Sequence, residues 1–138
     1  MLYLLISSRL RLRFERYLLN RADVASVVID GAGGQRLLEQ EMKQARIKPN
    51  PILPKVAEVV VANATFERGV NTGNILHKNQ PSLTQVVTNC ERRPIGSNGG
   101  FGFRSQFEDY NISLMDSAIL AYWACVDAKP KRQQRINY

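Results

Sequence analysis

The chain has 138 residues, close to the usual size of a single domain, and a chain of this length can bury a core without disulfide bonds. Hydrophobic residues make up 44% and charged residues 22%, which excludes an intrinsically disordered chain. The 19 Lys and Arg residues exceed the 12 Asp and Glu residues, so the formal net charge is +7. This charge indicates a polyanionic partner, most simply nucleic acid, with an anionic membrane surface as the alternative.

The first apolar run, residues 2–6, is far shorter than the roughly 20 residues of a membrane span. Its arginines follow it, which is the reverse of the order in a signal peptide. The two cysteines, Cys90 and Cys125, do not have the spacing of zinc ligands and are too few for a disulfide scaffold. We therefore expect a protein of the reducing cytoplasm, without a membrane anchor.

The first third of the chain predicts helix, strand and helix. Residues 1–20 have apolar positions at helical spacing; residues 9–14 also alternate like a strand, but the length of the run favours a helix. Residues 24–29 are short, β-branched and continuously apolar, as in a buried parallel strand. The glycines of 31–34 predict a tight turn, and 35–46 predict an amphipathic helix.

The rest of the chain continues to alternate strands and helices, which predicts an α/β domain over 1–128 followed by a basic disordered tail over 129–138. We expect, in order, a break at 48–51, at most a short strand at 52–53, a helix over 56–70, a turn at 71–73, a short strand at 74–77, a helix starting at Pro81, a hairpin or mobile loop at 95–103 and a final helix over 112–126.

Asp30 is the first candidate for chemistry, because it ends an apolar strand directly before the glycine turn. In open α/β sheets, sites lie outside the carboxyl ends of the strands. The alternative is that Asp30 only caps the turn that follows. The turn itself matches neither a dinucleotide-binding fingerprint nor a Walker A motif, so a phosphate pocket there is the weaker interpretation.

Asp116 is the second candidate, because it interrupts a helix that is otherwise apolar. A carboxylate is costly to bury without a partner or a metal. The alternative places it on a solvent-facing polar stripe with Ser113 and Ser117. Together, Asp30 and Asp116 could hold a divalent cation through hard oxygen ligands, as in phosphodiester hydrolysis.

Further charged residues surround these two candidates. Glu108 and Asp109 precede the last helix and could cap it or join the same acidic cluster. Basic residues that could contact nucleic acid flank the predicted loops: Lys55, Arg92, Arg93 and Arg104. Phe101 and Phe103 lie beside them, as in proteins that bind single strands, although a solvated basic surface explains the arginines equally well. The lone His77 is interpreted as structural.

Several segments occur together in an order that resembles a known family. They are Val27-Val28-Ile29-Asp30-Gly31, the helix with Leu37-Leu38, Ala62-Asn63-Ala64-x-Phe66-Glu67, His77-Lys78-Asn79-Gln80-Pro81-Ser82-Leu83 and Ile112-Ser113-Leu114-Met115-Asp116-Ser117-Ala118. This set, over about residues 9–126, resembles the C-terminal nuclease part of tailed-bacteriophage terminase large subunits. No single motif is diagnostic; the order and the His-x-x-Gln-Pro-x-Leu segment carry the resemblance.

The resemblance implies a ribonuclease-H-like fold, a mixed sheet with flanking helices, and a carboxylate cluster that holds Mg²⁺ or Mn²⁺. It implies cleavage of double-stranded phage DNA during packaging in the bacterial host cytoplasm, with the terminase small subunit and the portal as partners. Asp30 matches the family's acid at the end of a central strand. Asp116, Asp109 or a neighbouring residue matches the acid supplied by the last helix. The resemblance therefore makes Asp30, Asp109 and Asp116 candidate metal ligands.

The chain also departs from the family pattern. The family's first catalytic Asp lies on an earlier strand that we do not find, no Walker A sequence of the packaging ATPase is present, and Asn111 stands where related sequences often carry Asp. The chain thus resembles a C-terminal fragment, such as a prophage remnant, and we expect weak cleavage or none by it alone. The alternative functions are a degenerate module that binds DNA or a packaging partner, and a small nucleotide-binding protein.

Overall fold

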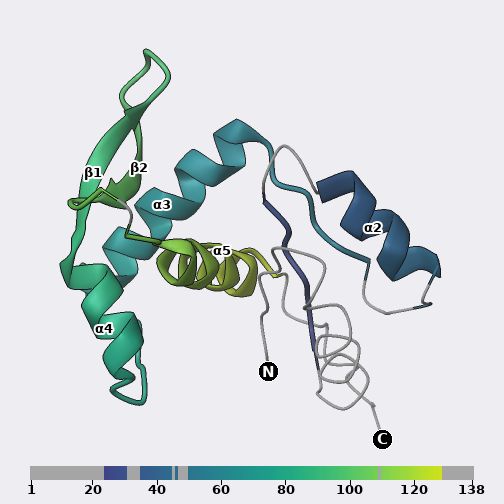
Figure 1. Cartoon of the computed structure of the whole chain (residues 1–138), viewed down its shortest axis with the longest axis horizontal. Coiled ribbons are helices and arrows are strands. Elements are labelled where there is room, and N and C mark those ends of the chain that lie inside the picture. Colours follow the sequence, from purple (N-terminus) through teal and green to yellow (C-terminus); the bar gives the residue numbers. More distant parts are fainter. Residues whose placement is uncertain (1–23, 31–34, 45, 47–49, 109, 129–138) are drawn as a thin grey trace, which may run out of the picture.

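The computed structural model describes residues 24–30, 35–44, 46, 50–108 and 110–128. These residues form four α-helices and a two-stranded antiparallel sheet, which confirms the α/β class in its coarse form. The elements are α2 (Gln35–Gln44), α3 (Val56–Asn71), α4 (Pro81–Thr88), β1 (Cys90–Ile95), β2 (Gly100–Ser105) and α5 (Ser113–Asp127). Figure 1 shows the β1–β2 hairpin beside α3, and α2 on the other side of the extended segments that cross the middle of the molecule.

The apolar segment before Asp30 is extended and buried, and its one pairing is parallel, as expected for it; the pairing is a single bridge between Val28 and Ile52 rather than a full strand. The backbone N–H of Ile29 donates to the carbonyl of Ile52 at 2.9 Å, and that of Ile52 donates to the carbonyl of Val27 at 2.8 Å. These two hydrogen bonds fix the direction in which the chain reaches Asp30.

Both faces of this segment are buried, because successive side chains of an extended chain point to opposite sides. Val27 and Ile29 pack with Met42 of α2, and Val28 belongs to the main core. Burying a Val or Ile side chain contributes roughly 1.5–3 kcal/mol, so the segment is firmly anchored between α2 on one side and the main core on the other. Asp30 is the first polar side chain after this anchor.

The main core lies chiefly between α3 and α5. Its buried side chains are Val28, Ala62, Phe66, Val86, Met115, Ile119, Leu120, Trp123 and Ala124. The rings of Phe66 and Tyr122 meet edge to face, with their centroids 6.2 Å apart. Gly69 allows this close approach, because a Cβ atom at its position would lie 2.7 Å from the Tyr122 hydroxyl oxygen.

The hairpin predicted around 95–103 is confirmed, and it is longer than the sequence indicated. β1 and β2 pair from Cys90 opposite Ser105 to Ile95 opposite Gly100. Pro94 is tolerated because both strands are edge strands of this two-stranded sheet. The turn uses glycines with positive φ, 69° at Gly96 and 76° at Gly99.

The strand predicted over 74–77 is wrong: these residues form an irregular connection, and Leu76 is 93% exposed. The backbone N–H of Asn74 donates to the carbonyl of Gly69 at 2.9 Å, and its side chain donates to the Thr72 hydroxyl at 2.8 Å. These hydrogen bonds close the end of α3 as a turn instead of extending the chain. The helix predicted to start at Pro81 is present as α4 and ends at Thr88, and Cys90 begins strand β1.

A ribonuclease-H-like mixed sheet is not confirmed, because the described part of the chain contains only the hairpin and the isolated Val28–Ile52 bridge. That topology stays a prediction. The predictions for 1–20, for the turn at 31–34, for residues 48–49 of the break and for the tail at 129–138 fall outside the described residues. None of the helices within the described ranges combines the length and apolarity that a membrane span requires.

Candidate functional site

Asp30 and Asp116, the two acids singled out from the sequence, line the same pocket. The pocket has a volume of about 340 Å³ and lies where the end of the segment 24–30, the side of α3, the hairpin and the start of α5 meet. Three apolar side chains form part of its wall: Val59, Ile95 and Ile112. The fold therefore brings together two carboxylates that come from distant parts of the chain.

Asp116 lies in the first turn of α5 and is half-buried, so the solvent-facing alternative is not what the structure shows. The pKa of its carboxyl is raised from 3.8 to about 6, chiefly by loss of solvent and also by the negative charge of Asp30, against the opposing effect of Arg93. The charge of Asp30 thus acts directly on Asp116. Two carboxylates that repel each other in this way form a favourable place for a cation.

Asn111 has a different role from Asp116. Its side-chain oxygen accepts a hydrogen bond from the backbone N–H of Ser113 at 2.7 Å and another from the Ser113 hydroxyl. The amide therefore forms an Asx turn directly before α5, which amides and carboxylates both can do. Glu108 is exposed, and Asp109 lies outside the described residues. Of Asn111 and Asp116, it is Asp116 that shares the pocket with Asp30.

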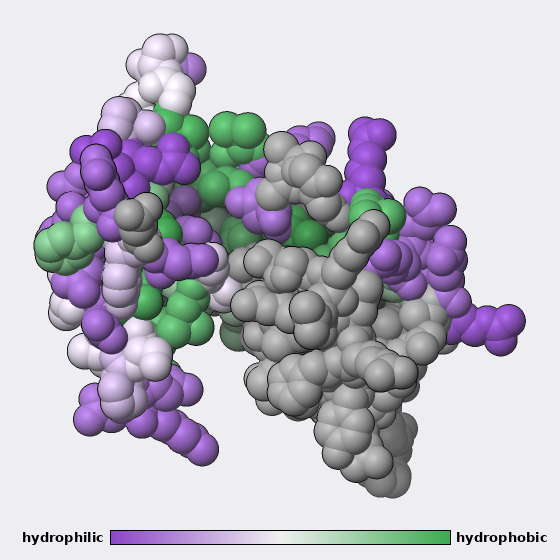
Figure 2. Space-filling view, viewed as in Figure 1, coloured by the Kyte–Doolittle hydropathy of each residue, from purple (hydrophilic) through white to green (hydrophobic). Residues whose placement is uncertain are grey.

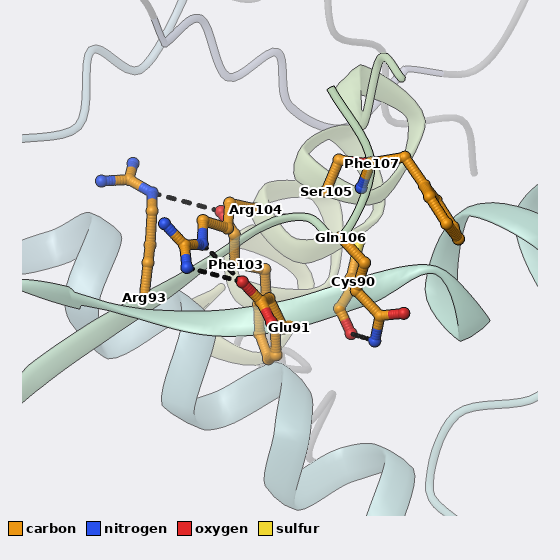
Figure 3. Close-up of polar contacts among 8 residues, drawn as sticks. All are labelled: Cys90, Glu91, Arg93, Phe103, Arg104, Ser105, Gln106 and Phe107. Atoms are coloured by element: carbon orange, nitrogen blue, oxygen red, sulfur yellow. Dashed lines mark hydrogen bonds and ion pairs between the residues drawn. The ribbon is translucent and has the colours of Figure 1, made fainter. Parts of the chain in front are cut away.

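Arg93 and Arg104 supply positive charge to the pocket wall. Nε of Arg93 donates to the backbone carbonyl of Phe103 at 3.2 Å, and Nε of Arg104 donates to a Glu91 carboxylate oxygen at 2.7 Å. The strand register places both arginines on one face of the hairpin, and Figure 3 shows their guanidinium groups on the same side. A phosphate group that entered the pocket would meet this face.

The other two basic candidates lie elsewhere. Arg92 is on the opposite face of β1, where it bonds to the Glu67 carboxylate and lies 4.2 Å over the centre of the Phe101 ring. Lys55 precedes α3, where its backbone N–H donates to Glu58 at 2.6 Å, and it is not among the residues of the pocket wall. Figure 2 shows hydrophilic side chains over the hairpin and α4, with apolar side chains visible between the hairpin and α2.

Asn63 also lines the pocket, although no role in the site was predicted for it from the sequence. It is 5% exposed and is the buried polar side chain of the described core. Its side-chain N–H donates to the carbonyl of Val59, one turn earlier in α3, at 2.7 Å. The signal in the sequence was an amide on the helix face that also carries Ala62 and Phe66, where an apolar residue would ordinarily stand.

The donor chemistry of the pocket fits a hard divalent cation. Mg²⁺ and Mn²⁺ prefer oxygen ligands, and Mg²⁺ needs only one or two carboxylates because it keeps several waters. Within the described ranges, no group of three or more His, Cys, Asp or Glu side chains could hold a metal ion. The pocket wall carries side-chain oxygens of Asp30, Asp116, Asn63 and Ser105, and a cation would offset the repulsion between the two acids.

His77 and Cys90, which were also considered from the sequence, are not among the residues that line the pocket. His77 is exposed in the connection between α3 and α4 and does not line the pocket. Cys90 is half-buried, and burial raises the pKa of its thiol, with a further rise from the negative charge of Asp116. The effect of Asp116 on Cys90 places this thiol near the carboxylate that faces the pocket.

Function must be inferred from this site rather than from relatives. The overall arrangement of helices and hairpin does not by itself specify an activity. The terminase resemblance stays a hypothesis that depends on the segments quoted above. Comparison of the chain with protein-family models, with curated proteins and with solved structures gives no match.

Proposed function

We propose that this chain is a metal-dependent DNA endonuclease domain of the terminase large-subunit type, with its active site in the pocket that holds Asp30 and Asp116. The observation that carries the proposal is that these two carboxylates share one pocket and that the charge of Asp30 acts on Asp116. Paired acids of this kind are the usual ligands of Mg²⁺ or Mn²⁺ in enzymes that cut phosphodiesters.

Asp30 and Asp116 would hold the cation, which when bound polarises the scissile phosphate and lowers the pKa of the attacking water. The chain's own contribution is to bind and orient the DNA. Arg93 and Arg104 offer guanidinium N–H groups that suit phosphate oxygens, and the apolar wall of the pocket strengthens these charge interactions. The carboxylates act as ligands, and neither is assigned the role of a general base.

The substrate class in this proposal is double-stranded DNA, because the chain is basic and the two arginines present positive charge beside the acids. The terminase small subunit and the portal are proposed partners on the strength of the sequence resemblance. We expect slow cleavage by the isolated chain, because only two carboxylates line the pocket among the described residues.

The test is nicking of supercoiled plasmid DNA by the full chain with Mn²⁺ or Mg²⁺. We expect weak nicking that needs the metal and falls at least tenfold in both Asp30→Asn and Asp116→Asn, since each substitution removes a charged ligand. Lys43→Gln on α2 is the matched control, because Lys43 is exposed and forms its ion pair with Glu39, on the same helix. Nicking that survives both acidic substitutions would contradict the proposal.

A DNA-binding module without cleavage is the second candidate. It is favoured by the hairpin, which carries Arg93 and Arg104 on one face and Arg92 stacked on Phe101 on the other. This candidate predicts DNA binding that weakens steeply with salt and is unaffected by Mn²⁺. Binding of that kind, with no nicking in any metal, would select it over the endonuclease.

A further inference from the structure

We propose that the side-chain oxygen of Asn63 is a third ligand of the divalent cation held by Asp30 and Asp116. This inference rests on the proposed function, because it concerns the same pocket and the same cation. It assigns a neutral amide to a position beside two acids. Amide carbonyl oxygens are ordinary ligands of hard cations in proteins.

The first step is the orientation of the Asn63 amide. Its Nδ2 donates to the carbonyl oxygen of Val59 at 2.7 Å. A carbonyl can accept a hydrogen bond but cannot donate one, so the opposite orientation would place two acceptors against each other. The network therefore fixes Oδ1 as the end of the amide that is not used within α3.

The second step is the state of that oxygen. Asn63 is 95% buried, yet Oδ1 accepts no hydrogen bond from any residue that the structure describes. A buried acceptor without a donor is destabilising by about 1–3 kcal/mol, and such groups are rare in folded proteins. Because Asn63 lines the pocket, an occupant of the pocket can remove this cost.

The third step is the nature of the occupant. The side-chain oxygens of Asp30, Asp116 and Asn63 are all acceptors when the acids are ionised, and all three residues line the pocket, so each can be a ligand of one small cation. Arg93 also lines the pocket, and its Nε donates to the Phe103 carbonyl. A small cation can contact several oxygens at once, which a guanidinium of fixed planar geometry cannot do as closely.

The neutral charge of the amide has a consequence of its own. A third carboxylate would add to the repulsion that Asp30 already exerts on Asp116. An amide completes a set of three oxygens without this cost. It follows that Asn63→Asp will bind the cation more tightly, because it adds a negative charge at the same position.

The experiment is a titration of the full chain with Mn²⁺ at pH 7.5, in which the electron paramagnetic resonance signal of free Mn²⁺ gives the Kd without any nuclease assay. We expect a Kd about tenfold higher for Asn63→Ala and about tenfold lower for Asn63→Asp, in the range known for changes near metal sites. Asn71→Ala is the matched control, because Asn71 is an exposed asparagine on the same helix. Thermal unfolding in EDTA shows that each variant is folded, and an unchanged Kd for Asn63→Ala would contradict the inference whatever Asn63→Asp does.

The outcomes separate this inference from the proposed function. If both Asn63 variants keep the wild-type Kd within twofold while Asp30→Asn and Asp116→Asn lose Mn²⁺, the cation site stands and Asn63 is not its ligand. If the wild-type chain does not bind Mn²⁺, the proposed function fails, and the inference fails with it. A tenfold change in opposite directions for the two Asn63 variants, with none for Asn71→Ala, supports the inference.

Discussion

The carboxyl group of Asp116 faces the same pocket as Asp30, and the two charges repel each other. Asp30 reaches this position because the apolar segment before it is anchored by the parallel bridge to Ile52. Asp116 reaches it because the apolar face of α5 packs against α3 and fixes the orientation of the helix. Two separate packing requirements thus place two like charges together, which is costly without a counter-charge and useful with one.

The pKa of Asp116 makes folding stability depend on pH. Its pKa of about 6 in the folded chain lies above the ordinary value of 3.8, so the folded chain binds more protons than the unfolded chain between pH 4 and 6. Stability contributed by the protonated acid is present below pH 4 and is lost as the pH rises through 6. A shift of about two units corresponds to at most about 3 kcal/mol, which partial solvent exposure reduces to about 1–2 kcal/mol.

Urea unfolding of the wild type and Asp116→Asn at pH 4 and pH 7 checks this expectation. The substitution should stabilise the chain by about 1–2 kcal/mol more at pH 7 than at pH 4, because the amide cannot ionise. Comparing the two proteins at each pH cancels the contributions of the other acids. The same difference in free energy of unfolding at both pH values would show that Asp116 is not perturbed.

Arg93 should carry more of the DNA affinity than a basic residue outside the pocket. Replacing it by Gln is expected to weaken DNA binding about three- to tenfold and to reduce the slope of log affinity against log salt by about one. The control is Lys43→Gln, since Lys43 is paired with Glu39 on α2. Fluorescence anisotropy over a salt series measures both quantities, and equal effects of the two substitutions would count against a DNA-binding face on the hairpin.

Gly69 should resist substitution, although it lies in a helix. Alanine normally stabilises a helix relative to glycine by up to about 1 kcal/mol. Here a Cβ would lie 2.7–2.8 Å from atoms of the Tyr122 ring and hydroxyl, so Gly69→Ala is expected to destabilise the chain by about 1–3 kcal/mol. A double-mutant cycle with Tyr122→Leu should recover more than about 1 kcal/mol as coupling. Additive free energies of unfolding would mean that the two residues are not in contact.

Cys90 reports on the ionisation of Asp116 without metal or DNA. Burial and the charge of Asp116 both raise the pKa of its thiol, and only the thiolate reacts readily. Iodoacetamide should therefore modify the exposed Cys125 before Cys90 at pH 7.5. Asp116→Asn should speed the reaction of Cys90, because removal of this charge lowers the pKa of the thiol and raises its thiolate fraction at pH 7.5. Asp127→Asn, at the far end of α5, is the control that should leave the rate of Cys90 unchanged.

The positions of Asp30 and Asp116 could be predicted because each is marked by its local sequence. Asp30 follows a continuous apolar run, and Asp116 interrupts an apolar helix face, so both depend on periodicity alone. The place of Asn63 in the pocket wall could not be predicted in this way, because it depends on how the hairpin covers one side of α3. Nothing in the sequence near Asn63 indicates which element packs against it.

The strands of the structure differ from the predicted ones at residues 90–95 and at residues 74–77, and each difference has its own physical cause. β1 was not expected as a full strand because it contains three charged residues and Pro94, a composition typical of loops. The ladder with β2 and the ion pair between Glu91 and Arg104 hold it in place. Residues 74–77 contain an apolar pair that suggested a strand, but Asn74 is held in the turn that ends α3. Long-range pairing with β2 thus makes β1 a strand, whereas a local hydrogen bond keeps residues 74–77 from forming one.

Anomalous diffraction from crystals of the full chain soaked in Mn²⁺ tests the central claim most directly, because it locates the cation without reference to activity. We expect one anomalous peak in the pocket, with carboxylate oxygens of Asp30 and Asp116 at about 2.0–2.3 Å from it. The peak should disappear in Asp116→Asn. Carboxylates that face away from each other, with no peak between them at millimolar Mn²⁺, would contradict the assignment of this pocket as a metal-dependent active site.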